Sequence, residues 1–86
     1  MRWGRRMRLV RFTRSVIVRM CVRDGPKETF FDLHIYLGQT HLVHDWDYIL
    51  ESNGEVCVLD FVRPRGSGSV PADSFNWVGT SLFIDR

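Results

Sequence analysis

The sequence predicts an all-β fold built on an antiparallel four-strand meander, followed by one more strand near the C-terminus. Three observations carry this prediction. Apolar residues alternate with polar ones along most of the chain, which is the period of a half-buried strand. Turn signals separate the alternating runs. When neighbouring runs are paired through those turns, their apolar residues fall on one common face.

The first strand is expected over residues 10–22, where even positions are mostly apolar and odd positions are mostly Arg, Thr and Ser. A four-residue turn at 24–27, Asp-Gly-Pro-Lys, leads to a second strand over 29–37. This register matches apolar residues on one face and opposite charges on the other, where each charge pair contributes about 0.2–1 kcal/mol. The predicted pairs are Val16 with Ile35, Val18 with Leu33, Met20 with Phe31, Val22 with Thr29, Arg19 with Asp32, and Arg23 with Glu28.

Two further turn signals extend the meander. A Gly-X turn at residues 38–39 opens a third strand that runs to residue 51, and an Asn-Gly turn at 53–54 opens a fourth. Asn-Gly is the strongest two-residue hairpin signal, because a type I′ turn needs positive φ at both positions. The resulting pairs, which make one apolar face continuous from Val10 to Phe61, are Ile35 with Leu42, Leu33 with His44, Leu50 with Cys57, Tyr48 with Leu59, and Trp46 with Phe61.

The chain, residues 1–86, is expected to form a single β domain. Residues 1–7 make a basic arm, and residues 64–79 are expected as a loop, with a short helical turn capped by Asp73 as one option. A last strand follows over residues 80–85. Without helices to cover it, the apolar face has to be buried by curling into a small barrel-like sheet, by a second sheet, or by face-to-face packing in a dimer.

Charge is distributed unevenly along the chain. Residues 1–23 hold eight arginines and no acid, and residues 24–86 hold four basic and ten acidic groups, for a net charge of +2. Two cysteines are too few for a disulfide framework, so a reducing, cytoplasmic location is expected. Arginines interrupt every apolar stretch that would suit an export signal or membrane span. A mitochondrial transit peptide and a natural start at Met7 remain alternatives for the N-terminus.

The arginine-rich N-terminus is the best nucleic-acid feature, because guanidinium groups contact phosphates and an indole ring offers a stacking surface. A solubilising or subunit-bridging tail is the alternative role. The candidate nucleic-acid-binding residues are Arg2, Trp3, Arg5, Arg6, Arg8 and Arg11.

Histidines around the second turn and aspartates near the Asn-Gly hairpin form a candidate ligand or interface patch: His34, Tyr36, His41, Asp45, Asp47 and Asp60. Asp47 is predicted to face Asp60, and neutralisation by an arginine is the favoured reading of that carboxylate pair. His41 and His44 are three residues apart on a strand and point to opposite faces, so they do not chelate together. We therefore predict no metal site and no cofactor.

No catalytic constellation emerges from the residue pattern. Cys57 and His44 would make a nucleophile and base, but Cys57 lies among apolar neighbours, where it is expected to be a buried inert thiol. The glycines at positions 66 and 68 lack the lysine and helix start of a phosphate loop. The sequence thus favours a protein that is not an enzyme.

The second face of the meander carries surplus apolar residues, and a contiguous apolar patch usually marks an interface. Its predicted interface residues are Ile17, Phe30, Val43, Ile49, Val56 and Val58. The leading hypothesis is a non-enzymatic interaction module that self-associates through its β-sheet, with a homodimer favoured and no membrane partner. The alternative is a small nucleic-acid-binding β-barrel that uses the N-terminal arginines.

Overall fold

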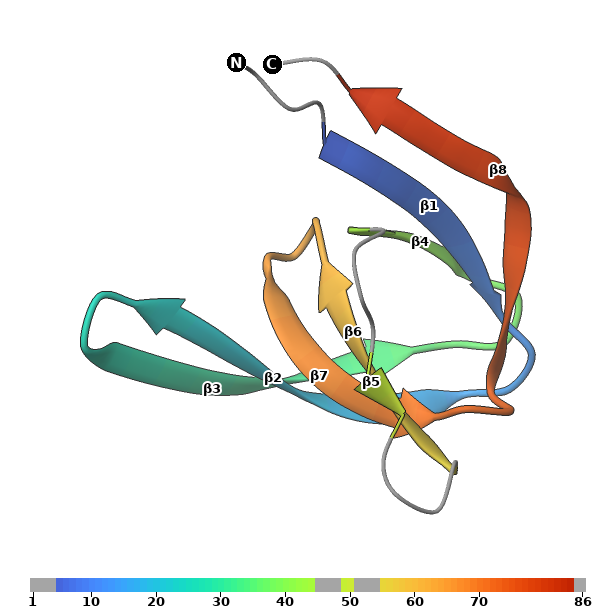
Figure 1. Ribbon diagram of the computed structural model, residues 1–86. Coiled ribbons are helices and arrows are strands. Elements are labelled where there is room, and N and C mark those ends of the chain that lie inside the picture. The colour runs from blue at the N-terminus through green and yellow to red at the C-terminus, as the bar shows by residue number, and fades with distance from the viewer. Residues whose placement is uncertain (1–4, 45–48, 51–54, 85–86) are drawn as a thin grey trace.

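The computed structural model describes residues 5–44, 49–50 and 55–84, and within these it describes the side chains of residues 7–44 and 55–79. These residues form one curled antiparallel sheet without helices (Figure 1), which confirms the all-β prediction. The strand order is β3-β2-β7-β6-β4-β1-β8, with β5 beside β6. The strands are β1 (Arg5–Phe12), β2 (Val16–Asp24), β3 (Lys27–Ile35), β4 (Thr40–His44), β5 (Ile49–Leu50), β6 (Val56–Phe61), β7 (Gly66–Pro71) and β8 (Phe75–Ile84).

The sheet is curled but open. Its two edges are β3 and β8, which do not pair with each other in the described part of the chain, so the sheet curls, as one of the predicted alternatives has it, without closing into a barrel. In the described part of the chain, no helix has the length and apolar character needed to cross a membrane.

The long first strand predicted over residues 10–22 is two strands. β1 and β2 both keep the predicted alternation, but Thr13, Arg14 and Ser15 break the run between them. The Thr13 N–H donates to the carbonyl oxygen of Ser74 at 2.8 Å, and the Ser15 Oγ accepts from the Leu37 N–H at 3.2 Å. The break lets β1 pair with β4 and β8 while β2 pairs with β3 and β7. Residues 5–7, predicted as part of a basic arm, belong to β1.

The hairpin of β2 and β3 has the predicted register at every position, including Arg19 with Asp32 and Arg23 with Glu28. Its turn is shorter than expected, because Asp24 and Lys27 already pair with each other. The turn is therefore Gly25 and Pro26. Gly25 has a φ of 64°, a conformation that glycine adopts without steric cost.

The third strand does not continue the meander. The Gly38 N–H donates to the Phe12 carbonyl oxygen and the Phe12 N–H to the Gln39 carbonyl oxygen, at 2.8 and 2.9 Å. These bonds dock the turn on the end of β1, so β4 runs beside β1 instead of β3. The predicted pairs of Ile35 with Leu42 and of Leu33 with His44 are therefore wrong. The buried face of β4 is also the opposite one, because Val43 is fully buried and His44 only partly.

Only part of the predicted fourth hairpin falls on described residues. Leu50 pairs with Cys57 as predicted, and Ile49 pairs with Val58. The Asn-Gly turn, Trp46 and Tyr48 lie outside the described residues. Phe61 pairs with Val43 of β4, and among the described residues this is the one ladder pair between β4 and β6.

Residues 64–79, predicted as a loop with an optional helical turn, instead form β7 and the first half of β8, while the predicted last strand forms the second half of β8 up to Ile84. The loop prediction is wrong because glycines occupy the inner face of β7. Gly66 lies opposite Phe61, and Gly68 lies opposite both Leu59 and Met20. A Cβ at position 68 would lie 2.4 Å from Cγ1 of Val18. The Arg63–Pro64 peptide in the turn before β7 is cis.

The core lies on one face of the curled sheet and draws on every strand longer than two residues. Most of it is the predicted apolar face, to which β4, β7 and β8 add Val43, Val70 and Phe75. Its buried members are Val10, Phe12, Val18, Met20, Ile35, Val43, Cys57, Leu59, Phe61, Val70 and Phe75.

Candidate interaction surface

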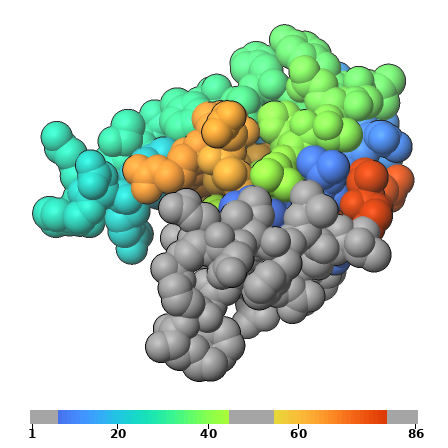
Figure 2. All heavy atoms as spheres, turned by 90° about the horizontal axis from the view of Figure 1, so that it is seen from above, coloured from blue at the N-terminus to red at the C-terminus, as the bar shows by residue number. Residues whose placement is uncertain are grey.

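The β2–β3 hairpin projects beyond the rest of the sheet. β2 meets β7 only through the pairs of Met20 with Gly68 and Cys21 with Ser67, so the tip of the hairpin has no further strand beside it in the described structure. Figure 1 shows this hairpin extending to the left, and Figure 2 shows its atoms, in cyan and teal, standing out from the body of the molecule. Side chains on both faces of the tip are consequently exposed.

Exposed large hydrophobic residues gather on this hairpin and on the turn that follows it. Among the described side chains, every exposed large hydrophobic residue lies there, and we call the set the hairpin surface. Its members, with their exposed fractions, are Ile17 (64%), Phe30 (50%), Phe31 (36%), Tyr36 (58%) and Leu37 (66%). Scattered single apolar residues are normal on a protein surface, whereas a contiguous apolar patch indicates a contact site.

The turn after β3 is held in place by side-chain hydrogen bonds. The Tyr36 N–H donates to Oε1 of Gln39 at 3.0 Å, and the Leu37 N–H donates to Oγ of Ser15. These bonds fix the backbone from which the two exposed side chains of the turn project. A shallow cleft lies beside them, lined by Ser15, Val16, Ile17, His34, Ile35 and Tyr36.

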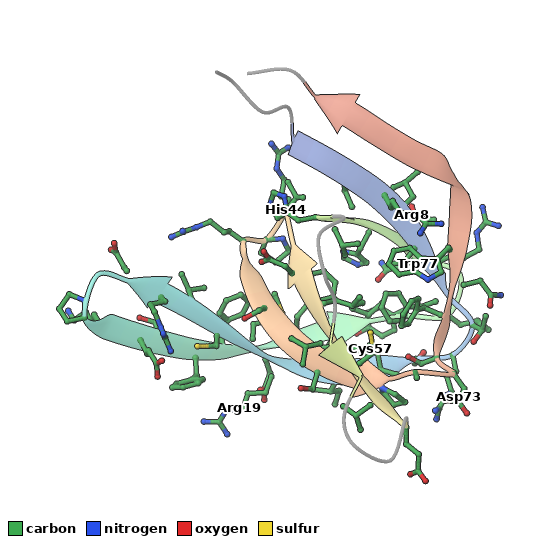
Figure 3. All side chains as sticks on the ribbon, in the orientation of Figure 1. Arg8, Arg19, His44, Cys57, Asp73 and Trp77 are labelled. Carbon is green, nitrogen blue, oxygen red and sulfur yellow. The ribbon has the colours of Figure 1, made fainter. Side chains whose placement is uncertain are left out.

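Two pairs of oppositely charged residues lie on one face of the hairpin. Arg23 forms an ion pair with Glu28, the cross-strand partner predicted from the sequence. Arg19 lies opposite Asp32 in the ladder, and its guanidinium carbon lies 5.2 Å from the ring centroid of Phe30 (Figure 3). Exposed ion pairs contribute little to stability. They place arginines on β2 and carboxylates on β3, on a face that also carries exposed apolar residues.

The predicted interface residues are divided between this surface and the rest of the sheet. Ile17 and Phe30 belong to the hairpin surface, and Val56 and Val58 are half-buried on β6. The prediction that Val43 lies on the second face is wrong. β4 pairs with β1 instead of β3, and Val43 is buried in the core. Ile49 lies in β5, and its side chain is outside the described part.

The predicted ligand patch is not assembled at one place. His34 and Tyr36 line the cleft beside the hairpin surface, but His41 lies on β4 with its ring against Phe12 and Phe61, at centroid distances of 6.1 and 5.7 Å. Asp60 is half-buried on β6 and lines a separate pocket with Arg23 and Arg65. Asp45 and Asp47 lie outside the described residues.

Burial lowers the pKa of His41 from its ordinary value of 6.5, and a hydrogen bond with the backbone of Arg63 opposes this in part. The unfolded chain therefore takes up this proton at a higher pH than the folded protein does, and acid favours unfolding. We expect the free energy of unfolding to fall as the pH is lowered from 6.5 through the depressed pKa. Urea unfolding from about pH 8 to about pH 5 measures this, and a His41→Gln variant should lose that part of the slope. An unchanged slope in the variant would assign the pH dependence to other groups.

Two of the predicted nucleic-acid-binding arginines have described side chains. Arg8 is half-buried, with its guanidinium carbon 4.2 Å from the ring centroid of Trp77 on β8, and Figure 3 shows the two side chains together. A cation over an indole face is stabilised by the ring quadrupole, so Arg8 serves the packing of β1 on β8. Arg11 is exposed. Arg2 and Trp3 lie outside the described residues, as do the side chains of Arg5 and Arg6.

The remaining chemical candidates lie apart from one another. Cys57 is buried in the core, and burial raises the pKa of its thiol. His44 alternates with the buried Val43 and so points to the other face of β4. Within the described ranges, no three His, Cys, Asp or Glu side chains are grouped so that they would hold a metal ion.

The predicted pairing with Met20 puts Phe31 on the apolar face, whereas 36% of Phe31 is exposed and it belongs to the hairpin surface. The residue alternation correctly assigns Phe31 to the core side of its strand. It carries no signal that β3 is an edge strand whose end extends past the core.

Comparison of the chain with models of protein families, with curated proteins and with solved structures found no match. The structure itself therefore has to supply the argument for function.

Proposed function

We propose that this protein is a non-enzymatic interaction module that associates with a second copy of itself through its β-sheet, with the hairpin surface as the contact. The observation that carries the proposal is that, among the described side chains, the exposed large hydrophobic residues lie on one hairpin and the turn after it, and that the outer strand of this hairpin, β3, is an edge of the sheet.

An edge strand presents a row of backbone N–H and C=O groups that another strand can pair with. Strand addition of this kind takes its affinity from the backbone bonds and its selectivity from the side chains that alternate along the edge. The aromatic side chains Phe30 and Phe31 lie on opposite sides of β3. A strand added at this edge would thus meet an aromatic ring on each face of the extended sheet.

The test is the molar mass in solution, measured by light scattering after size exclusion at tens of micromolar. We expect a dimer for the unmodified chain and a shift toward monomer for a Phe30→Ser variant, because that change removes exposed aromatic area from the contact. An Arg11→Ser variant is the control, since Arg11 is exposed on β1 at a distance in the sheet order from β3. A chain that remains a monomer at these concentrations would refute the proposal.

A further inference from the structure

The outer edge of β3 supports a specific geometry for the dimer. β3 pairs with β2 along its nine residues, Lys27–Ile35, and it ends the strand order of the sheet. From this edge we infer that two copies join through antiparallel pairing of their β3 strands in one register, with Phe31 opposite the second copy's Phe31. This inference rests on the proposed function and specifies its geometry.

Symmetry limits the registers that are available. When a two-fold axis perpendicular to a sheet relates two identical antiparallel strands, each face of one continues into the same face of the other only if the axis passes through a residue position. β3 runs from Lys27 to Ile35, so its central residue is Phe31. Centring there pairs the whole strand, whereas centring on Phe30 leaves residues 34–35 unpaired, and centring on Asp32 leaves residues 27–28 unpaired.

The charges on the outer face favour the same register. Centring on Phe31 places Glu28 opposite the second copy's His34, and Phe30 opposite its Asp32. Moving the centre to Phe30 would oppose Glu28 with Asp32, and moving it to Asp32 would oppose that carboxylate with itself. Like charges directly opposite destabilise a strand pair. Of these three registers, the full-length one is therefore also the one without a carboxylate pair.

The core-side face supplies an apolar contact in this register. Phe31 lies beside the fully buried Met20 in the β2–β3 ladder, yet 36% of Phe31 remains exposed. Pairing around Phe31 would set two such rings side by side across the axis, and aromatic pairs stabilise beyond their buried area. Thr29 would lie opposite the half-buried Leu33, so the core face of one sheet would continue into that of the other.

The direction of the backbone N–H and C=O groups of β3 is compatible with this register. Asp24 and Lys27 close a two-residue turn, and in such a hairpin the closing pair exchanges hydrogen bonds, as does every second pair after it. Phe31 then bonds inward to β2, while the even-numbered residues of β3 direct their N–H and C=O groups outward. In the proposed register Phe31 and its symmetry mate form a non-hydrogen-bonded pair, for which a Cα separation of about 4.5 Å is typical.

That separation suits a disulfide, so cysteine scanning tests the register. We would make the variants Phe31→Cys, Thr29→Cys and Leu33→Cys in a Cys21→Ser background, which removes the half-buried natural thiol, and oxidise each with oxidised glutathione. The Phe31→Cys variant is expected to form the covalent dimer in at least roughly tenfold greater yield than the other two, whose cysteines would lie several residues apart across the axis.

Charge substitution at position 34 provides a second test that leaves Phe31 in place. His34 lies opposite Ile17 within its own hairpin, so its side chain is directly opposite Glu28 only across the proposed interface. A His34→Glu change should weaken the dimer by roughly tenfold, because two symmetric contacts become repulsive. A His34→Lys change should leave the dimer as tight as before or tighter.

The outcomes separate this register from the broader proposal. A monomeric chain would overturn both. A dimer that crosslinks best through Thr29→Cys or Leu33→Cys, or one that His34→Glu and His34→Lys affect equally, would overturn the register and leave self-association standing. Preferential crosslinking at position 31, together with a dimer that His34→Glu weakens and His34→Lys does not, would support the register.

Discussion

A Gly68→Ala variant is expected to lose about 3 kcal/mol of unfolding free energy, the upper part of the range for overpacking a dense core. The added Cβ would lie 2.4 Å from Cγ1 of Val18, 3.0 Å from the carbonyl oxygen of Arg19 and 3.2 Å from Sδ of Met20. The second of these is a backbone atom, which no rotamer change relieves. β2 and β7 would have to separate at the point where they pair.

Urea unfolding followed by tryptophan fluorescence measures the effect. Ser69→Ala is the matched control, because Ser69 is the next residue of β7 and its side chain is exposed. We expect the control to change stability by less than about 0.5 kcal/mol. If Gly68→Ala were equally mild, the close approach of β2 to β7 would not be a requirement of the fold.

A Phe61→Ala variant is expected to lose about 4 kcal/mol, within the range for removing a fully buried phenylalanine ring. Phe61 lies at the junction of the two parts of the sheet, where it pairs with Val43, and the Val62 N–H bonds the Leu42 carbonyl oxygen at 3.0 Å. With so short a ladder between β4 and β6, side-chain packing has to hold the β1–β4–β8 part to the rest. The ring contact of Phe61 with His41 is part of that packing.

The conservative control is Phe61→Leu, which keeps most of the apolar volume and should lose clearly less. Thermal unfolding by calorimetry and by circular dichroism would report both variants. We also expect a broader transition for Phe61→Ala, because weakening the junction reduces the coupling between the two parts of the sheet. A sharp transition with a loss below about 1 kcal/mol would contradict this role for Phe61.

Local pattern was sufficient for the β2–β3 hairpin. Its alternation, its turn and its two charge pairs all specify one register, and agreement of this kind is what makes a prediction dependable. The pairing of Leu50 with Cys57 followed in the same way from the Asn-Gly signal. In both cases the partners are close in sequence, and a turn signal lies between them in the sequence.

The pairings that were missed are those between distant segments. The break at Thr13–Ser15 contains neither glycine nor proline, and it is stabilised by Ser74 and Leu37, which come from far along the chain. β7 has no apolar alternation on its inner face, because glycines there make room for Met20 and Leu59. Glycines in a sequence are typical of a loop. Only the position of the large neighbouring side chains shows that these glycines belong to a strand.

The candidate site was predicted in part for the same reason. Ile17 and Phe30 followed from the register of the hairpin, whereas the exposure of Phe31 depends on β3 being an edge, which is a property of the strand order. For Val43 the prediction was exposure and the structure shows burial, which depends on β1 as the neighbouring strand. Sequence alternation assigns a residue to a side of its strand but does not reveal what covers that side.

The pairing of β1 with β8, from Arg5 with Ile84 to Phe12 with Phe75, has a consequence for biogenesis. At a synthesis rate of roughly 5–20 residues per second, β1 waits several seconds on the ribosome before β8 is made. The β2–β3 hairpin needs only its own adjacent residues and can form during that interval. The hairpin that carries the β3 edge can thus be complete while the strand that pairs with β1 is still being synthesised.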